Sequence, residues 1–309
     1  MKKVFIDGSA GTTGLRIYQR LESRKDIELI RLNECDRKDK EKRREAINAS
    51  DITFLCLPDE AAIEAVSLCT NPDTVIIDTS TAHRKHPDFV YGLPELSVDQ
   101  FEKIRASKRI AVPGCHAGGF VALVYPLIKA GILDKNTALF CHSVTGYSGG
   151  GKKMIAEYEG DCKTALMEAP RQYGLTQNHK HLKEMKAICM LEHNPIFCPV
   201  VSDFYSGMVV TVPLFSKDLK YGSADDIKKI YKSLYCGPVV NYTEEIADGG
   251  FLSGAKMSGL DSMEISVLGN EERILLVAAF DNLGHGASGC ALECMNIVLG
   301  CSVTDGLGL

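Results

Sequence analysis

The sequence predicts an α/β protein of two domains, the first built on a parallel sheet that helices cover on both faces. Three observations lead to this prediction. A glycine-rich turn joins the first strand to the first helix, short apolar strands alternate with helical segments through the first third, and longer strands dominate the second half. The 309 residues are enough for two domains, each with its own core.

The first third reads as alternating strands and helices. Residues 2–7 (KKVFID) form the first strand, and the amphipathic run LRIYQRLES follows a turn. A second helical pattern, DEAAIEAVSLC, covers residues 59–69. The apolar strands lack the alternation of a half-exposed strand, which favours a buried parallel sheet. Further strands are expected at residues 27–32, 51–57, 74–80 and 109–114.

The turn GSAGTTG has glycines three residues apart, directly after the first strand. Gly8 would permit the tight turn, Gly11 the close approach of a pyrophosphate, and Gly14 the packing of helix on strand. The helix N-terminus offers N–H groups and a partial positive charge to the phosphates. A plain turn is the alternative. The remaining candidate phosphate-binding residues of this turn are Ser9, Ala10, Thr12 and Thr13.

The residues after the second strand bear on the choice of dinucleotide. An acidic side chain there favours a free ribose 2′-hydroxyl, and arginine favours a 2′-phosphate. Glu34 and Asp36 compete with Arg31, Arg37 and Lys38. The basic cluster favours NADP, with Arg37 and Lys38 as the candidate contacts, although these residues alone leave NAD open.

One cysteine of the twelve stands out, in the stretch IAVPGCHAGGF. Cys115 follows a strand end and a Pro-Gly turn, and the apolar run of residues 116–132 after it reads as a buried helix. A helix N-terminus stabilises a thiolate, as a nucleophile requires. A buried structural cysteine is the alternative, and it is our interpretation of the other eleven.

A thiolate beside a nicotinamide indicates acyl transfer to sulphur, with the thioester then accepting or surrendering hydride. Such a site needs a base. His116 is adjacent to Cys115, but neighbouring residues on a helix point in different directions, so we do not choose it. His179 and His181 in the polar segment QNHKHLKEM are better candidates. Two solvated surface histidines are the alternative.

Two polar clusters are candidates for binding an anionic substrate. Residues 148–152 are expected to form a flexible loop whose amides and lysine hold an anion, and a plain surface loop is the alternative. After another strand end, Ser80 and Arg84 offer a hydroxyl and a guanidinium. Ser80 is also a candidate cofactor contact, and capping of a buried helix is the alternative for it. The candidates in the loop are Ser148, Gly149, Gly150 and Lys152.

The overall composition excludes other classes of function. The net charge is −5 and acidic and basic residues are interspersed, so the sequence shows no basic cluster of the kind that binds nucleic acid. The charge-dense residues 35–48 are expected to be a solvated helix or loop. No apolar run reaches the ~18 residues that span a bilayer, and no signal pattern precedes the first strand. The scattered cysteines form no C-x-x-C pairs, so we expect no metal site and a reducing, cytosolic environment.

Taken together in order, several motifs resemble a known family. KVFIDGSAGTTGL, DTSTAHR, VYGLPEL, PGCHAGGF, SVTGYSGGGKK, NHKH and DNLGHGASGCALECMN are similar to N-acetyl-γ-glutamyl-phosphate reductases of arginine biosynthesis, in particular the shorter-chain form. The resemblance covers essentially the whole chain. It implies NADPH-dependent reduction of the acyl phosphate N-acetyl-L-glutamyl 5-phosphate to the 5-semialdehyde, with phosphate released. It also implies a cytoplasmic homodimer or homotetramer.

The resemblance also implies roles for particular residues. Cys115 would form the thioester, and the family's H-x-H motif falls on His179 and His181, of which we favour His181 as the acid/base. Longer members commonly follow this motif with Pro-Glu. Here the segment reads HKHLKEM, so the proline of that pair is missing. Glu184 supplies the acidic residue and is a candidate substrate contact. Asn282 is expected to bind the cofactor.

The implied fold is a Rossmann-like domain (residues 1–114) followed by an α+β catalytic and oligomerisation domain (115–281). Residues 282–309 would return to the first domain as a helix, with Gly286 letting backbone approach the nicotinamide. Strands are expected in NPIFCPVV and GMVVTVPLF, and a hairpin in MEISVLG and RILLVAAF. The alternatives are an enzyme like aspartate-semialdehyde dehydrogenase, whose cysteine has a different local sequence, and a non-catalytic NADPH-binding regulator.

Overall fold

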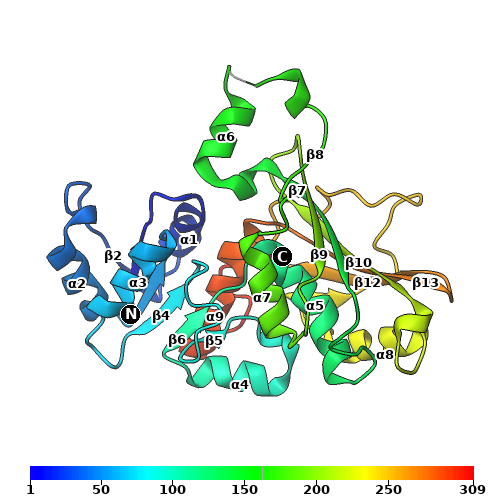
Figure 1. Cartoon of the computed structure of the whole chain (residues 1–309). Helices are drawn as coiled ribbons and strands as arrows, with labels where there is room; N and C mark the ends of the chain where they lie inside the picture. The colour runs from blue at the N-terminus through cyan, green and yellow to red at the C-terminus, as the bar shows by residue number, and fades with distance from the viewer. Residues whose placement is uncertain (162) are drawn as a thin grey trace. The chain divides into compact units, whose positions relative to one another are not determined.

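The computed structural model describes residues 1–161 and 163–309, and the chain divides into two compact units (Figure 1). The second unit contains most of the middle of the chain. The first unit comprises Met1–Pro94, Val98–Gly114 and Ala287–Leu307, and the second comprises Glu95–Ser97, Cys115–Gly286 and Gly308–Leu309. The chain therefore returns to the first unit at Ala287, five residues later than the expected 282.

The first unit is built on a six-stranded sheet in the order β2-β1-β3-β4-β6-β5, with every neighbouring pair parallel. The central strands are buried on both faces, which explains why their sequences do not alternate. The strands are β1 (Lys2–Asp7), β2 (Ile27–Ile30), β3 (Ile52–Leu55), β4 (Val75–Asp78), β5 (Val90–Tyr91) and β6 (Arg109–Ala111). The two-residue β5 has no counterpart in the predicted strands.

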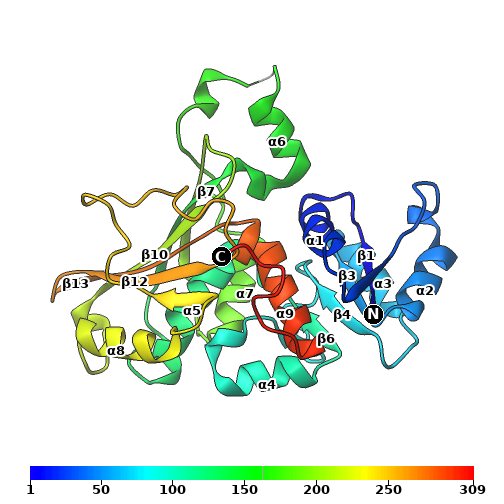
Figure 2. The same cartoon turned by 180° about the vertical axis from the view of Figure 1, so that it is seen from behind.

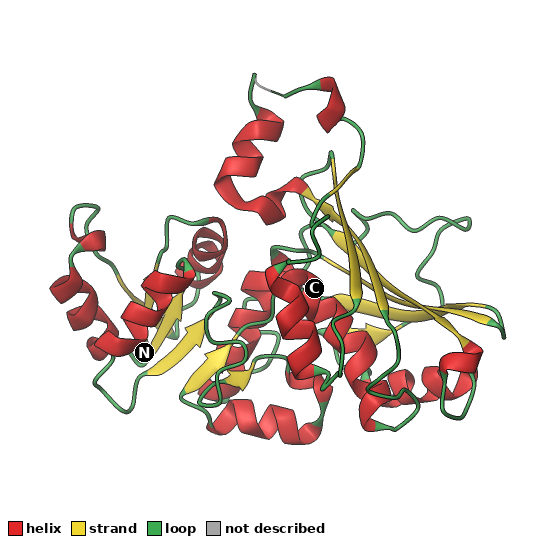
Figure 3. Cartoon of the chain, viewed as in Figure 1, coloured by secondary structure: helices red, strands yellow, loops and turns green. Residues whose placement is uncertain are grey.

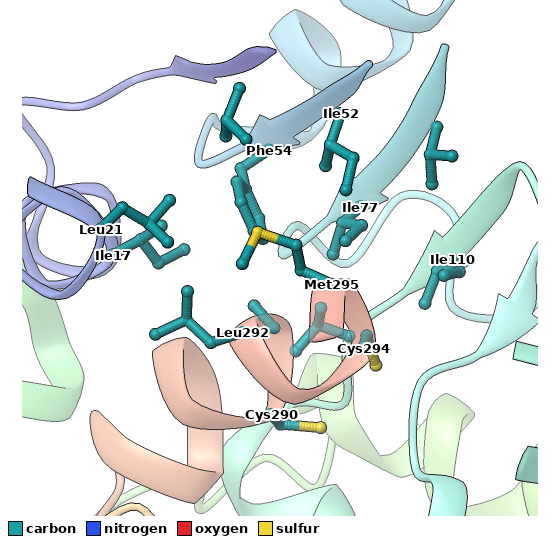
Figure 4. Close-up of a cluster of buried hydrophobic side chains, with 14 of the residues drawn as sticks. Ile17, Leu21, Ile52, Phe54, Ile77, Ile110, Cys290, Leu292, Cys294 and Met295 are labelled. Carbon is teal, nitrogen blue, oxygen red and sulfur yellow. The ribbon is translucent and has the colours of Figure 1, made fainter. Parts of the chain in front are cut away.

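Helices cover both faces of this sheet. The helices are α1 (Thr12–Glu22), α2 (Lys40–Ala49), α3 (Asp59–Leu68), α4 (Val98–Ala106) and α9 (Gly289–Leu299). Successive strand residues face opposite sides, so Phe54 packs with α1, α4 and α9 while Leu55 packs with α2 and α3. Met295 of α9 lies against Phe54 and Ile77, and Leu292 lies on the side of Ile17 and Leu21 in the same cluster (Figure 4). The last helix thus belongs to the core of the first unit, as predicted.

The second unit contains a seven-stranded mixed sheet in the order β11-β12-β13-β10-β7-β9-β8 (Figures 2 and 3). The expected hairpin is confirmed, because β12 and β13 pair antiparallel. The strands are β7 (Phe140–Gly146), β8 (Arg171–Gln172), β9 (Ile196–Ser202), β10 (Met208–Phe215), β11 (Val240–Tyr242), β12 (Met263–Gly269) and β13 (Arg273–Phe280). The helices are α5 (Cys115–Lys129), α6 (Gly151–Glu159), α7 (Lys180–Ile188) and α8 (Ala224–Leu234).

Helix α5 packs closely on the mixed sheet. A Cβ at Gly119 would lie 2.8 Å from the Phe280 ring, so only glycine allows this approach. Pro126 lies inside α5 and cannot donate to the carbonyl four residues earlier. The hydroxyl of Tyr235 donates to that carbonyl, Ala122 O, at 2.5 Å, and so replaces the missing hydrogen bond. Phe280 of β13 and Tyr235, which follows α8, thus both contact the helix that begins at Cys115.

Short helical turns complete the chain: η1 (Asp36–Lys38), η2 (Pro94–Leu96), η3 (Tyr147–Gly150), η4 (Ala165–Met167), η5 (Ser216–Asp218) and η6 (Gly284–Ser288), the last a π-helical turn. At two of these turns the structure differs from the prediction made from the sequence. The expected loop of residues 148–152 is η3 followed by the start of α6. The charge-dense segment is η1 and α2, and it is not fully solvated, because Arg43 is buried and pairs with Asp7 and Glu64.

Candidate functional site

The glycine-rich turn of the first unit has the geometry expected of a phosphate cradle. Gly8 has a φ of +90°, and a Cβ there would lie 2.3 Å from Cys56 O. A Cβ on Gly14 would lie 2.4 Å from Gly8 O, so this glycine lets the helix pack against the turn. Gly11 is not confined in this way, since its Cβ would have no contact shorter than 3.4 Å.

Gly11 is the N-cap of α1, and no side chain caps this helix. Thr12 and Thr13 are its first two residues, and Ser9 and Ala10 complete the turn. The space above Gly11 and the start of an eleven-residue helix fit a pyrophosphate, which would accept hydrogen bonds from the first N–H groups of α1. The residues present thus suit a dinucleotide.

The basic residues near β2 differ in their surroundings. Arg31, directly after β2, lies over the Tyr18 ring and pairs with Glu22 at 3.4 Å. Arg37 and Lys38 are exposed on η1. Among the described residues, neither of these two forms an ion pair, so both remain available to a 2′-phosphate.

Ser80 and Arg84 follow the carboxyl end of β4, but both side chains are engaged inside the first unit. The Ser80 hydroxyl donates to Asp78 at 2.7 Å, and His83 Nδ1 lies 2.6 Å from the same carboxylate. No helix begins at Ser80, so helix capping, the alternative considered for it, is wrong. The guanidinium of Arg84 is buried and donates to the carbonyls of Val112 and Thr79, both at 2.9 Å. These bonds tie the ends of β4 and β6 together.

Cys115 is the first residue of α5, at the start of the second unit. The side chain is partly exposed, and the fifteen-residue helix directs the positive end of its dipole at this residue. Gly286 of η6 lies against it, since a Cβ there would be 2.9 Å from Cys115 Cβ. The predicted cofactor residue Gly286 therefore contacts the predicted nucleophile.

His116 lies at the centre of a cluster of aromatic and polar side chains. Its Nδ1 is 2.7 Å from Ser143 Oγ, and its Nε2 is 2.7 Å from Tyr173 Oη. Burial, followed by the charge of His179, lowers the pKa of His116 to about 3. His116 is consequently neutral at physiological pH, and it cannot serve as a general acid there.

The two histidines of the H-x-H motif join this cluster at the start of α7. The His181 ring lies 5.4 Å from that of His116, and the His179 ring lies 6.2 Å from it. His179 is the N-cap of α7, and its Nδ1 accepts the backbone N–H of His181 at 3.3 Å. Burial, with a smaller effect of Lys180, lowers the pKa of His179. The alternative of two solvated surface histidines is wrong, because His181 is buried.

Glu184 lies three residues after His181 on α7, and both side chains are buried. Residues at this spacing share one face of a helix. The missing proline does not prevent α7 from presenting the histidine and the carboxylate on the same face.

The glycine-lysine segment is partly buried beside Asn282. The Asn282 amide donates to Ser148 Oγ at 3.0 Å and accepts from Gly207 N at 2.9 Å. A Cβ at Gly149 would lie 3.3 Å from Asn282 Nδ2. Lys152, in contrast, is exposed on α6. Asn282 thus positions η3 within the second unit.

Sequence reasoning missed two residues of the cluster and set aside a third. His116 was rejected because of its direction on the helix, and Ser143 and Tyr173 were not considered. Tyr173 comes six residues before His179 and reaches His116 only because β8 pairs with β9. No local pattern marks such a contact, since it joins the residue after β8 to helix α5, 57 positions earlier in the chain.

Within the described chain, no helix has both the length and the apolar character needed to cross a membrane. The same residues contain no group of three or more His, Cys, Asp or Glu side chains placed to hold a metal ion.

Comparison with solved structures shows the fold. Aspartate semialdehyde dehydrogenase II from Vibrio cholerae, complexed with ASA, superposes with a TM-score of 0.72 at 15% identity, over 97% of this chain and 98% of that one. The aspartate semialdehyde dehydrogenase of Candida albicans with NADP gives 0.71 at 14% identity, over 98% and 99%.

Sequence comparison identifies the family. Residues 3–104 match the NAD binding domain of semialdehyde dehydrogenases, and residues 115–282 match their dimerisation domain. The N-acetyl-gamma-glutamyl-phosphate reductase of Sinorhizobium medicae is 42% identical, covering 96% of this chain and 98% of that protein. N-acetyl-gamma-glutamyl-phosphate reductase 2 of Nostoc is also 42% identical, covering 99% of both. The chain therefore belongs to the N-acetyl-gamma-glutamyl-phosphate reductases, with the two-domain fold of the semialdehyde dehydrogenases.

Proposed function

We propose that this protein reduces N-acetyl-L-glutamyl 5-phosphate to N-acetyl-L-glutamate 5-semialdehyde and phosphate, through a thioester on Cys115. The observation that carries the proposal is the full-length similarity to reductases of this name. A cysteine at a helix N-terminus supports it, because the next residue, His116, lies close to two further histidines. From the same family we also infer a role in arginine biosynthesis and a cytoplasmic location.

The first chemical step belongs to Cys115. The thiolate attacks the acyl carbon, a C–S bond forms, and the C–O bond to phosphate breaks with release of inorganic phosphate. The N-terminus of α5 supports this step, because its N–H groups favour the negative charge of the thiolate. Gly286 supports it as well, since a larger residue would displace Cys115.

The first unit would bind the dinucleotide, with pyrophosphate at Gly8–Gly14 and the N-terminus of α1. When bound, NADPH supplies the hydride that reduces the thioester carbon. We infer a preference for NADP over NAD because Arg37 and Lys38 are exposed close to β2 and could bind a 2′-phosphate. Ser80 and Asn282 would act indirectly, through the backbone and side chains that they hold in place.

We assign the proton transfer to His181. Collapse of the reduced thioester regenerates the cysteine sulphur and requires a group that moves a proton at the reacting oxygen or sulphur. His179 is the fallback, but its Nδ1 is occupied as the N-cap of α7, which supports a structural role. Glu184 shares the buried face of α7 with His181 and would orient it or contact substrate.

The phosphate and carboxylate of the substrate require donors. Ser148, Gly149 and Gly150 supply a helical turn immediately before α6, and Lys152 supplies a charge on that helix. Arg84 is a weaker candidate for binding the substrate than the sequence indicated, because its guanidinium already donates hydrogen bonds to two backbone carbonyls. We therefore place the anion-binding group in η3 and at the start of α6.

A homo-oligomer is proposed from one face of the mixed sheet. Strand register places Phe140, Ile196, Pro213 and Leu275 on the same side, and all four are exposed. Exposed apolar side chains that are contiguous on a sheet favour association with another surface. The matched domain is described as a dimerisation domain, which agrees with this face being covered by a second copy.

The activity is tested in reverse. Purified protein is given NADP, phosphate or arsenate, and either N-acetylglutamate semialdehyde or aspartate semialdehyde, and NADPH formation is followed. We expect phosphate-dependent reduction of NADP with the N-acetylated substrate. A preference for aspartate semialdehyde would assign the chain to the other enzyme, and no turnover with either would support a non-catalytic regulator.

A further inference from the structure

The carboxylate of Asp281, directly after β13, is completely buried and joins separate segments of the second unit. Its Oδ1 accepts the backbone N–H groups of Leu283 and Gly284, at 2.7 and 2.9 Å. Its Oδ2 accepts the Ser206 hydroxyl at 2.7 Å and the backbone N–H of Gly259. A carboxylate can accept all of these donors, because its two oxygens have about four lone-pair sites.

The backbone of Asp281 determines where η6 runs. Its carbonyl accepts the N–H of Gly286 at 2.9 Å, a bond between residues five apart, which is the pattern of a π-helical turn. A Cβ on Gly286 would lie 3.1 Å from this carbonyl oxygen and 2.9 Å from Cys115 Cβ. Gly286 is therefore packed between Asp281 and Cys115, so any shift of η6 changes its contact with the cysteine.

These bonds hold η6 more tightly than an ordinary turn is held. A hydrogen bond from a backbone N–H to a carboxylate is stronger than one to a neutral carbonyl. Leu283, Gly284 and Gly286 are buried, so water does not readily replace Asp281 as their acceptor. A buried N–H that loses its acceptor is destabilising. The position of η6 therefore depends on Asp281.

The next residue, Asn282, extends the same support to the proposed anion-binding segment. Its amide accepts from Gly207 N and donates to Ser148 Oγ of η3. Ser206, which donates to Asp281, directly precedes Gly207, so both side chains bind the same loop between β9 and β10. The two consecutive residues thus connect η6, which contacts the cysteine, with η3.

We propose that Asp281 is a positioning residue, which holds Gly286 against Cys115 and thereby fixes the nucleophile relative to η3. The proposal rests on the proposed function in taking Cys115 as the nucleophile. Displacement of a reacting group by about 1 Å can cost on the order of 100-fold in rate. A carboxylate that is completely buried can therefore set kcat without touching the substrate.

The first measurement needs neither substrate nor cofactor. N-Ethylmaleimide and iodoacetamide both react with the thiolate of Cys115, so the ratio of their rates does not depend on how much of the thiol is ionised. The bulkier maleimide gains more when the backbone at Gly286 loosens. Peptide mass spectrometry gives both rates, at a temperature at which every variant is fully folded.

Asp281→Asn should raise the ratio of the maleimide rate to the iodoacetamide rate by about threefold, because local opening exposes the sulphur. The amide nitrogen of asparagine is itself a donor, so one of the present donors to Asp281 loses its acceptor. Ser206→Ala should raise the ratio less, because it removes one donor and leaves the bonds to Leu283 and Gly284 in place.

The second measurement is steady-state turnover. Asp281→Asn should lower kcat by about tenfold and leave the KM for NADP nearly unchanged, because the glycine turn lies in the first unit. The loss should be much smaller when Gly286 is already alanine, since residues that act through one contact are not additive. It should remain at full size in the Gly237→Ala background, where a new Cβ meets no atom closer than 3.8 Å.

Asp226→Asn is the control for loss of a capping carboxylate, since Asp226 accepts the N–H and the hydroxyl of Ser223 at the start of α8. It should lower the melting temperature and leave the ratio of alkylation rates unchanged. If Asp281→Asn does not fold, Ser206→Ala decides the outcome.

Two results would overturn the proposal. One is an unchanged ratio of alkylation rates in Asp281→Asn, or in Ser206→Ala where Asp281→Asn does not fold. The other is an equal loss of kcat from Asp281→Asn in the Gly286→Ala and Gly237→Ala backgrounds. Failure of the reductase assay would leave the alkylation rates intact, so the two proposals fail separately.

Discussion

Gly286 lies so close to Cys115 that a Cβ on the glycine would be 2.9 Å from the Cβ of the cysteine. Residues 171 positions apart thus meet where η6 passes the start of α5. The close approach constrains both backbone segments, and it gives the first of five predictions.

Gly286→Ala should reduce turnover by about tenfold or more, because a displacement of about 1 Å at a reacting group can cost on the order of 100-fold. Steady-state kinetics and the alkylation rate of Cys115 measure the effect. The matched control is Gly237→Ala, where the nearest atom to a new Cβ is 3.8 Å away. If both variants behave alike, the contact with Cys115 does not matter for activity.

Cys115→Ser should lose several orders of magnitude in turnover, because an alcohol at this place has neither comparable acidity nor comparable nucleophilicity. NADPH affinity, measured by fluorescence titration, should survive, since the glycine turn belongs to the first unit. Retention of more than about a tenth of the wild-type activity would rule out the covalent mechanism. Cys141→Ser, at a buried cysteine of β7, provides the comparison.

His181→Asn should lower kcat by about 10²–10⁴-fold, the usual range for a general acid–base group. It should also remove the ionisation of the general acid–base group from the pH–rate profile. His179→Asn should change kcat little, because the Nδ1 of His179 caps α7 and asparagine, itself a good N-cap, can keep that role. Equal, mild effects with unchanged pH profiles would exclude both histidines and make Glu184 the next residue to test.

Acid should destabilise the fold through its buried histidines. Burial lowers the pKa of His116 to about 3 and that of His285 to about 4, from 6.5. Both folded-state values lie below the unfolded value, so the stabilising neutral form is fully present above about pH 6.5. As pH falls from 6.5 towards 4, the unfolded chain binds protons that the native chain cannot, and stability declines.

Between these pKa values the free energy of unfolding should fall by up to about 1.4 kcal/mol per pH unit for each histidine. Urea unfolding at pH 7 and pH 5 should show this loss in the wild type, and His285→Gln should show a smaller one. His193→Gln, on the surface, serves as the control. A pH dependence that His285→Gln leaves unchanged would contradict the prediction.

Arg37→Ala and Lys38→Ala should weaken NADPH binding and leave NADH binding unchanged. A charge-assisted hydrogen bond from arginine to a 2′-phosphate contributes on the order of 1.5–3 kcal/mol, or about ten- to 150-fold in affinity. Arg44→Ala, an exposed arginine paired with Glu41 on α2, is the control. Equal catalytic efficiency of the wild type with NADPH and NADH would contradict the predicted preference for NADP.

Local sequence was sufficient for most of the fold. The first strand, Lys2–Asp7, and the hairpin of β12 and β13 occur at the predicted residues, because apolar runs bounded by turns constrain strands directly. It was insufficient where tertiary contacts override local propensity. Residues 148–152 contain three glycines and read as a loop, yet the chain there is helical, with Ser148 bonded to Asn282.

The sequence by itself determined the family, the glycine turn and the unusual position of Cys115, because each depends on residues that are adjacent in the chain. Only the tertiary structure decided the surroundings of that cysteine. His116 meets Ser143 of β7 and, beside the paired strands β8 and β9, Tyr173, and Gly286 arrives from the far end of the second unit. Contacts between strands depend on register, and register is fixed by the packing of the whole sheet.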